Sequence, residues 1–284
     1  MMGRPDGKKL KHTDPMYQVA VHAMPKRSDA MNAITLDIPY EPIREYVRAK
    51  KKEGIAMSNM TVILAGLVRL TAEYPAINRF VVNKRVYSRE KITVSMVVAG
   101  YKKNDGTANE GTMSKITFEP TDTIFQMNER IEKYIAENRV GDTSSERLIH
   151  AVTRIPGSIR LIANLARFAD KHNLLPRSVI DASPFHASML FTNLASIRTN
   201  HIFHHIYDFG TTSMSFAAGN PRYVPRQKNG EVVFEHCIPI GMMMDDRIVS
   251  GHYFAESFHR LKQLYADPSI MEQGLPAPIP DPEL

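Results

Sequence analysis

The sequence predicts an α/β fold: an α+β two-layer sandwich in which a mixed β-sheet is covered by helices. Strand-like and helix-like segments alternate without a fixed period, which argues against a repeat architecture. With 284 residues, of which 43% are hydrophobic, the chain is long enough to bury a substantial core. No stretch of about 18 apolar residues occurs, so we expect no membrane-spanning helix.

The first elements follow from local patterns. Residues 17–23 (YQVAVHA) and 33–38 (AITLDI) are predicted strands, joined by a polar connection rich in turn-forming residues. A helix is predicted over residues 42–54, with proline early and glycine at its end. Ser58 is expected to cap the next helix, which Pro75 terminates. Because that helix is apolar around most of its circumference, we place it at the centre of the core.

The middle of the chain combines strands with helical segments. Strands are predicted at residues 80–83, 85–87, 92–99 and 112–118. Ile124 and Ile131 then share one face of a helix. Residues 143–173 are predicted to be helical, with an interruption at residues 155–157. The basic, amphipathic stretch at residues 160–171 fits a packed outer helix, with a membrane-surface helix as the alternative.

The carboxyl-terminal third returns to strands. These are expected at residues 187–194, 208–219 and 232–244. Asn229 and Gly230 are predicted to form the hairpin turn between the last two strands. The closing helix places one apolar stripe on the core, formed by Phe254, Phe258, Leu261 and Tyr265. We expect the folded domain to span residues 16–268, between a basic disordered leader (residues 1–15) and a proline-rich tail (residues 269–284) with no core to join.

The net charge and the motifs of the sequence limit the kinds of partner that the protein can have. The net charge of +6 is compatible with nucleic acid, a membrane surface or an anionic cofactor. The sequence has no phosphate-cradling glycine loop, no GxSxG elbow, no paired cysteines and no aromatic-basic RNA-binding signature. We therefore expect no nucleic-acid partner and no metal. Cys237 is the only cysteine and the leader lacks the apolar stretch of a secretory signal, so a cytoplasmic protein is expected.

The order of the pieces near the carboxyl end resembles that of a known family. In the segment DDRIVSG, two adjacent acids follow an apolar strand and precede the closing helix. The catalytic domain of dihydrolipoyl acyltransferases and the related chloramphenicol acetyltransferase carry His-x-x-x-Asp-Gly at this turn, commonly within Asp-His-Arg-Val-Val-Asp-Gly. The residues that fit this pattern here are Asp245, Arg247, Ile248, Val249 and Gly251. The similarity runs from about residue 17 to residue 268, and residues 143–173 have no counterpart in the family.

The resemblance implies a fold, a reaction and partners. It predicts a chloramphenicol acetyltransferase-like fold and a free-standing acyltransferase that uses coenzyme A or acyl-CoA. It also predicts a small-molecule acyl acceptor and a homotrimer with active sites between subunits. Which residues bind the cofactor is not specified by any motif.

Two departures from the family fall on its catalytic residues. Asp246 stands at the position of the catalytic histidine, and Ser250 stands where the family has aspartate. The family's hydroxyl group, which stabilises the tetrahedral oxyanion, is retained as Thr192. An ordinary aspartate is a much weaker base than histidine, and loss of a general base typically slows a reaction about 100- to 10,000-fold.

Nearby histidines are the alternative bases. His204 and His205 follow Thr192 in a stretch that resembles a family segment near the substrate channel. The simpler interpretation, which we favour, is that they are surface or interface histidines. His201 and His205 form a weak candidate metal pair, and His252 is a further candidate base beside the turn.

Two functional hypotheses remain open. The chain is either a coenzyme-A-dependent acyltransferase with altered acid and base residues, or a family member that kept the fold and serves as a binding or assembly subunit. A membrane-surface protein that uses the basic helix is a third.

Overall fold

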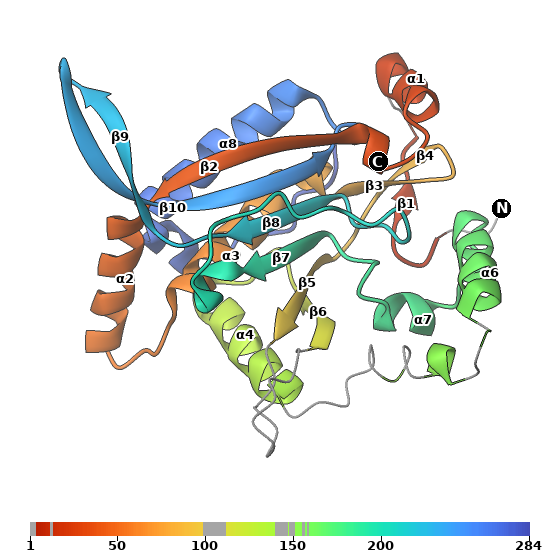
Figure 1. The fold of residues 1–284 in the computed structure, drawn as a ribbon, viewed down its shortest axis with the longest axis horizontal. Helices are drawn as coiled ribbons and strands as arrows, with labels where there is room; N and C mark the ends of the chain where they lie inside the picture. The colour runs from red at the N-terminus through yellow and green to blue at the C-terminus, as the bar shows by residue number, and fades with distance from the viewer. Residues whose placement is uncertain are drawn as a thin grey trace.

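The computed structural model describes residues 4–11, 14–98, 112–139, 147, 151–154, 157 and 159–284. Its centre is a mixed seven-stranded sheet in the order β2-β10-β8-β7-β5-β6, with β9 paired to β10 (Figure 1). β7 runs parallel to both β5 and β8, and the other neighbours are antiparallel. The predicted α/β class with a mixed sheet is therefore confirmed.

The strands are short except for β2 and β10, which run together along one side of the sheet. The large sheet contains β2 (Met31–Pro39), β5 (Ile92–Val98), β6 (Thr112–Phe118), β7 (Met189–Asn193), β8 (Met214–Ala218), β9 (Arg222–Lys228) and β10 (Glu231–Asp245). A second sheet in the order β1-β4-β3 contains β1 (Lys8–Lys9), β3 (Arg79–Val82) and β4 (Arg85–Ser88).

The helices pack around one central helix, α3. The bounds are α1 (Pro15–Ala23), α2 (Tyr40–Lys52), α3 (Asn59–Glu73), α4 (Ile124–Arg139), α6 (Ile159–Lys171), α7 (Arg177–Ala182) and α8 (Gly251–Ala266). Helices α2, α4 and α8 all contact α3, which also touches β5. The Ser58 hydroxyl accepts a hydrogen bond from the Thr61 amide at 3.0 Å and so begins α3 as predicted. α3 is buried along nearly its whole length, as its all-round apolar pattern predicted.

The prediction of a strand at residues 17–23 is wrong, because this segment forms α1. The Asp14 side chain accepts a hydrogen bond from the Met16 amide, and Pro15 occupies the first helical position. In α1 only Val21 is buried, while Met16 and Val19 are exposed. The short alternating pattern therefore had no buried face to specify a strand.

The hairpin turn is in the predicted place but joins a different pair of strands. Asn229 and Gly230 have φ of 51° and 86°, as a two-residue turn of this kind requires, and they connect β9 to β10. β9 was not predicted, because it is polar, mostly exposed and interrupted by Pro225. The hairpin projects from the body of the molecule (Figure 1).

Both ends of the chain pack on the domain, which differs from the expected disordered leader and unattached tail. In the leader, Arg4 is buried, the Asp6 side chain is only 7% exposed, and Leu10 joins the hydrophobic core. In the tail, the Asp281 carboxylate accepts two hydrogen bonds from the Arg79 guanidinium, at 2.7 and 2.5 Å. These tertiary contacts link residues far apart in the sequence.

The inserted segment is helical where the structure describes it. α6 lies at the outside of the molecule, where Asp170 is its only buried residue, and Leu161, Leu165 and Phe168 are exposed. Residues 143–146, 148–150, 155, 156 and 158, on which part of the helical prediction and of its interruption falls, lie outside the described residues. No helix in the described ranges combines the length and the apolar character needed to cross a membrane.

Candidate active site

The turn after β10 is organised around the Asp245 carboxylate, which is fully buried. The Arg247 guanidinium donates two hydrogen bonds to it, at 2.8 Å from Nε and 2.7 Å from Nη2. The Arg247 backbone amide adds a third at 3.1 Å. This bidentate, charge-assisted pair fixes the turn and holds the Asp245 carboxylate inside the protein.

Arg27 is a second cation on the same carboxylate. Its Nε lies 3.6 Å from Asp245 Oδ2, and its Nη1 donates to the Tyr207 carbonyl at 2.6 Å. Burial lowers the pKa of Arg27, and the negative charge of Asp245 opposes that shift. Arg27 thus ties the loop before β2 to the segment before β8. The sequence reasoning missed it, since one basic residue in a polar connection carries no signal.

Asp246 faces a different environment from its neighbour. Its backbone amide donates to the Ala30 carbonyl at 2.8 Å, and its Oδ1 accepts a hydrogen bond from Asn32 Nδ2 at 2.8 Å. The side chain is half-buried, so one carboxylate oxygen remains available at the surface of the turn. Burial raises the pKa of the nearby Tyr17 hydroxyl, and its hydrogen bond with Ser250 opposes this. Asn32 and Tyr17 were not among the predicted site residues.

Ser250 serves the helix that follows the turn. Its hydroxyl accepts a hydrogen bond from the Tyr253 amide at 3.2 Å and caps the amino end of α8. Ser250 is exposed, and so is His252, the second residue of α8. Ser250 therefore has a structural role at the start of α8 and carries no charge.

Thr192 lies on β7, away from the turn within one chain. It is half-buried and pairs with Ala217 of β8, which in turn pairs with Gly241 of β10. Asp246 is five residues beyond Gly241 along the strand direction, which corresponds to a separation of about 17 Å along the sheet. The two predicted catalytic groups are therefore not brought together by a single subunit.

The histidine segment crosses the sheet between these two points. His201 Nε2 lies 3.1 Å from Thr35 Oγ1, and a side chain added at Gly241 would meet the Ile202 carbonyl at 2.2 Å. Further along, the His204 carbonyl accepts a hydrogen bond from the Ser215 hydroxyl. The segment therefore runs toward the turn that carries Asp245 and Asp246. Glycine in β10 is what allows this close crossing.

His204 and His205 are the histidines on the turn side of that crossing. Their rings stack at 4.8 Å, and His204 Nδ1 is 2.8 Å from the His205 carbonyl. The His205 ring also meets Tyr207 edge-on at 4.9 Å. Burial lowers the pKa of His201, and the charge of Arg222 adds to the effect. In the described ranges no group of three or more His, Cys, Asp or Glu side chains is arranged to hold a metal.

A cavity of about 310 Å³ opens beside the end of β7, and Thr192 is not among its lining residues. Its lining includes Phe191 and Asn193, the neighbours of Thr192, and Ser58 and Asn59 at the amino end of α3. Because successive side chains of a strand point to opposite faces of the sheet, Thr192 lies on the face of β7 opposite to this cavity.

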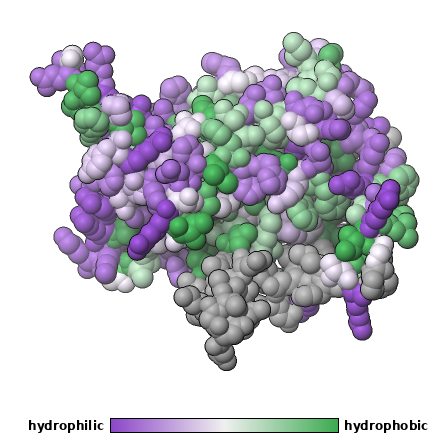
Figure 2. Space-filling view, viewed as in Figure 1, coloured by the Kyte–Doolittle hydropathy of each residue, from purple (hydrophilic) through white to green (hydrophobic). Residues whose placement is uncertain are grey.

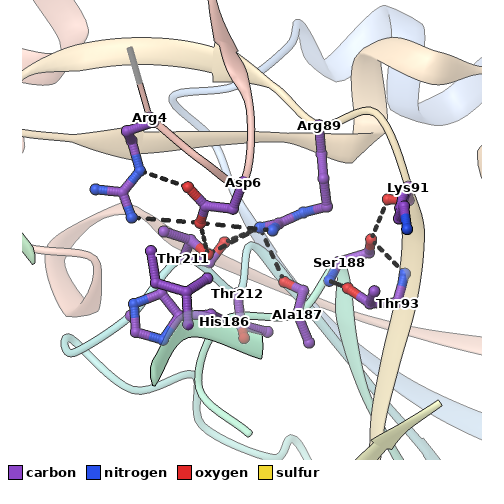
Figure 3. A network of polar contacts seen from close by, with 12 residues as sticks. Arg4, Asp6, Arg89, Lys91, Thr93, His186, Ala187, Ser188, Thr211 and Thr212 are labelled. Carbon is purple, nitrogen blue, oxygen red and sulfur yellow. Dashed lines mark hydrogen bonds and ion pairs between the residues drawn. The ribbon is translucent and has the colours of Figure 1, made fainter. Parts of the chain in front are cut away.

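A second buried polar cluster joins the leader to the rest of the fold (Figure 3). Arg4 Nε donates to Asp6 at 2.7 Å, while Arg89 donates to the Thr211 hydroxyl at 2.9 Å and lies 3.8 Å from Asp6. Burial alone would raise the pKa of Asp6, but the hydrogen bond from Arg4 and the charge of Arg89 hold it below its usual value. His186 lies beside this cluster, 3.3 Å from Asp170. None of these residues was predicted.

With this geometry established, the chain can be compared with known proteins. No family model matches it, and no curated protein matches it. Solved structures do. The cubic core of the pyruvate dehydrogenase multienzyme complex superposes with a TM-score of 0.58 at 12% identity, covering 93% of this chain and 94% of that one. The protein has the chloramphenicol acetyltransferase-like fold.

Two further structures agree with this assignment. A probable dihydrolipoamide acetyltransferase from Listeria monocytogenes gives a TM-score of 0.56 at 10% identity, covering 92% of this chain and 96% of that one. Chloramphenicol acetyltransferase itself gives 0.54 at 11% identity, covering 88% and 94%. The predicted chloramphenicol acetyltransferase-like fold is thus confirmed, while the chemistry of the site must be argued from this chain's own residues.

Proposed function

We propose that the protein is a coenzyme-A-dependent acyltransferase of the free-standing catalytic-domain type, working as a cytoplasmic homotrimer. The acyltransferase-like fold supports this reaction class. The observation that carries the proposal is the placement of Thr192 and Asp246 at opposite ends of the sheet in one chain. A site that uses both groups has to form between two subunits.

In the proposed reaction, the thiol or hydroxyl of a small acceptor attacks the carbonyl carbon of an acyl thioester. Asp246 accepts the acceptor's proton, and Asn32 holds its carboxylate in place. Thr192 donates a hydrogen bond to the oxyanion of the tetrahedral intermediate. As the intermediate collapses, the carbon–sulfur bond breaks and the coenzyme A thiolate takes the proton back from Asp246. Because aspartate is a weak base, the rate is expected to be low.

Exposed apolar side chains support assembly into an oligomer. Ile34, Ile202 and Phe203 lie near the crossing of the histidine segment and are 40%, 46% and 49% exposed. On the β9–β10 hairpin, Val232 and Phe234 are also exposed, and apolar side chains are visible on the projecting arm in Figure 2. Apolar side chains gathered on a surface indicate contacts with other protein chains.

The test is acyl transfer from acetyl-CoA to small thiols, measured as release of coenzyme A. Asp246→Ala and Thr192→Val should each lower the rate at least about 100-fold, since each removes a group that acts on the transition state. His259→Ala, which changes an exposed histidine further along α8, is the matched control and should keep the rate. Full activity in Asp246→Ala would move the base to His204 or His205, and full activity in both site variants would exclude this site.

A catalytically inactive binding or assembly subunit is the second candidate. It is favoured by Ser250, whose hydroxyl is used to cap α8. Under this alternative, no acyl transfer is detected and coenzyme A leaves the melting temperature unchanged, whereas a bound cofactor stabilises the enzyme. The double change Asp246→His with Ser250→Asp should then create activity only if the rest of the acyltransferase pocket is intact.

A further inference from the structure

Two cavities lie side by side against α6, in the segment that has no counterpart in the acyltransferase family. The first, which we call the basic cavity, has a volume of about 440 Å³. The second, the apolar cavity, has a volume of about 460 Å³. Arg167 and Phe209 line both, so the cavities share a wall. Each is in the size range of small-molecule sites, roughly 300–1,000 Å³.

The basic cavity carries an excess of positive charge. Its cationic lining residues are Lys26, Arg27, Lys84, Arg167, Lys171 and Arg247. Its carboxylates, Asp170 and Asp208, already accept hydrogen bonds from other groups: Asp170 from Arg4 at 2.7 Å, and Asp208 from the Arg27 amide at 3.1 Å. A concave surface of this kind attracts an anion.

Several of these cations have unused bonding capacity. Lys26, Lys84, Arg167 and Lys171 form no ion pair with any part of the chain that the structure describes. Deeper in the cavity, the buried Arg27 Nε has no hydrogen-bond acceptor, because its nearest carboxylate oxygen is 3.6 Å away. A buried donor without a partner is uncommon, and a bound anion would satisfy it.

The apolar cavity has almost no free polar groups. Its walls are the inner face of α6, with Ile162, Ala163 and Ala166, and the rings of Phe185 and Phe209. Ser183 also lines it, but the serine hydroxyl lies 2.8 Å from His186 Nδ1 and is satisfied there. An apolar cavity of this size holds water poorly and readily takes a hydrocarbon.

We infer that the two cavities together form a binding site for an amphipathic anion, a fatty carboxylate. The alkyl chain lies in the apolar cavity, and the carboxylate is held at the junction by Arg167 with Lys171 from the same helix. A planar guanidinium matches a carboxylate with two parallel hydrogen bonds. The site uses neither Thr192 nor Asp246, so it does not depend on the proposed acyl transfer.

The test is calorimetric titration of the whole protein with dodecanoate below its micellar concentration. The dissociation constant should decrease about four-fold for each added methylene from octanoate to dodecanoate, because each buried methylene contributes about 0.8 kcal/mol to the binding free energy. Dodecanol should bind at least about ten-fold more weakly than dodecanoate, and acetate should not bind. Equal binding of dodecanol, or no dependence on chain length, would overturn the inference.

Two variants separate the halves of the site. Arg167→Gln should weaken dodecanoate about ten-fold or more and leave dodecanol unchanged, while Arg160→Gln on the same helix, which does not line either cavity, is the matched control. Ala166→Phe should fill the apolar cavity and abolish binding of both ligands, with the circular dichroism spectrum reporting on folding. Unchanged dodecanoate binding in Arg167→Gln and Ala166→Phe would exclude the site.

A vesicle experiment tests the membrane alternative. If Ala166→Phe still binds phosphatidylglycerol vesicles and the protein does not bind free dodecanoate, this face is a membrane surface and the proposed fatty-carboxylate site is excluded.

Discussion

Two neighbouring carboxylates at the end of β10 have different partners. Asp245 is fully buried and sits between two guanidinium groups, those of Arg247 and Arg27. Asp246 is half-buried and bonded to an uncharged amide, that of Asn32. The first therefore stabilises the turn, and the second is the one with an oxygen free for chemistry. This division of roles underlies the first prediction.

Asp245→Asn should lower the free energy of unfolding by about 3–5 kcal/mol, because it leaves buried guanidinium charge without a counter-ion. Asp246→Asn, the matched control, should change it by less than about 1 kcal/mol, since the half-buried asparagine oxygen still accepts the hydrogen bond from Asn32. Urea denaturation followed by circular dichroism measures both. Similar values for the two variants would contradict the assigned roles.

Lys115 predicts a dependence of stability on pH. Its Nζ donates to the carbonyls of Ile180 and His186, at 2.6 and 3.0 Å, and burial lowers its pKa to about 8, with the charge of Arg89 adding to the effect. Between pH 8 and the ordinary value near 10.5, the unfolded chain binds this proton and the folded chain does not. Stability should therefore rise with pH across this window by about 3 kcal/mol, and below pH 8 the penalty is constant.

The measurement is the difference in unfolding free energy between the wild type and Lys115→Met at pH 7, 8, 9 and 9.5. Taking the difference removes the contributions of the other titratable groups, which are the same in both proteins. The unfolding free energy of the wild type should increase relative to that of the variant as the pH rises. A difference that stays constant from pH 7 to 9.5 would show that Lys115 has an ordinary pKa.

At the scale of elements, the sequence predicted best where one face of an element is fully buried. α3 and α8 have long apolar patterns, and both form as expected, with Phe254 and Leu261 buried on the predicted stripe. α1 and β9 were missed because each exposes most of its side chains, so neither has a strong period. Local patterns contain no information when the decisive contact is tertiary.

The candidate site shows the same division. Resemblance to a family pattern located Thr192 and the turn that carries Asp245 and Asp246. Both lie at or near the end of a strand. Arg27 lies beside Asp245, and Asn32 donates a hydrogen bond to Asp246. Both residues lie more than 200 positions earlier in the chain and match no motif. Pairings of this range are decided by the three-dimensional fold.

The carboxyl-terminal tail gives a prediction at this scale. Asp281→Asn should destabilise the fold by about 3–5 kcal/mol, because Arg79 is only 3% exposed and would keep its charge without a full partner. Glu283→Gln is the matched control: Glu283 lies 3.4 Å from Arg79 but is partly exposed, so its loss should change stability by less than about 1 kcal/mol. Thermal unfolding compares the two. An unaltered melting temperature in Asp281→Asn would mean that the tail is not held by this pair.

At the scale of the whole molecule, the arrangement of the sheet decides what one subunit can do alone. β7 and the turn after β10 lie on the same sheet, but Thr192 is level with Gly241 rather than with Asp246. A rigid sheet cannot fold these two groups onto each other. In a cyclic assembly, by contrast, the end of one subunit's β10 can face β7 of its neighbour.

This geometry predicts complementation between two inactive variants. A trimer of Asp246→Ala has no base, and a trimer of Thr192→Val has no oxyanion donor, so each alone should be inactive. When the two are unfolded together and refolded in equal amounts, subunits mix at random. A given interface then receives an intact Asp246 from one side and an intact Thr192 from the other in about a quarter of cases, so activity should return to about a quarter of the wild-type value. Mixing Thr192→Val with the double variant, which supplies no intact Thr192, should restore nothing. If both groups worked within one chain, the first mixture would also stay inactive while the wild type treated in the same way regained its rate, and the shared active site would be excluded.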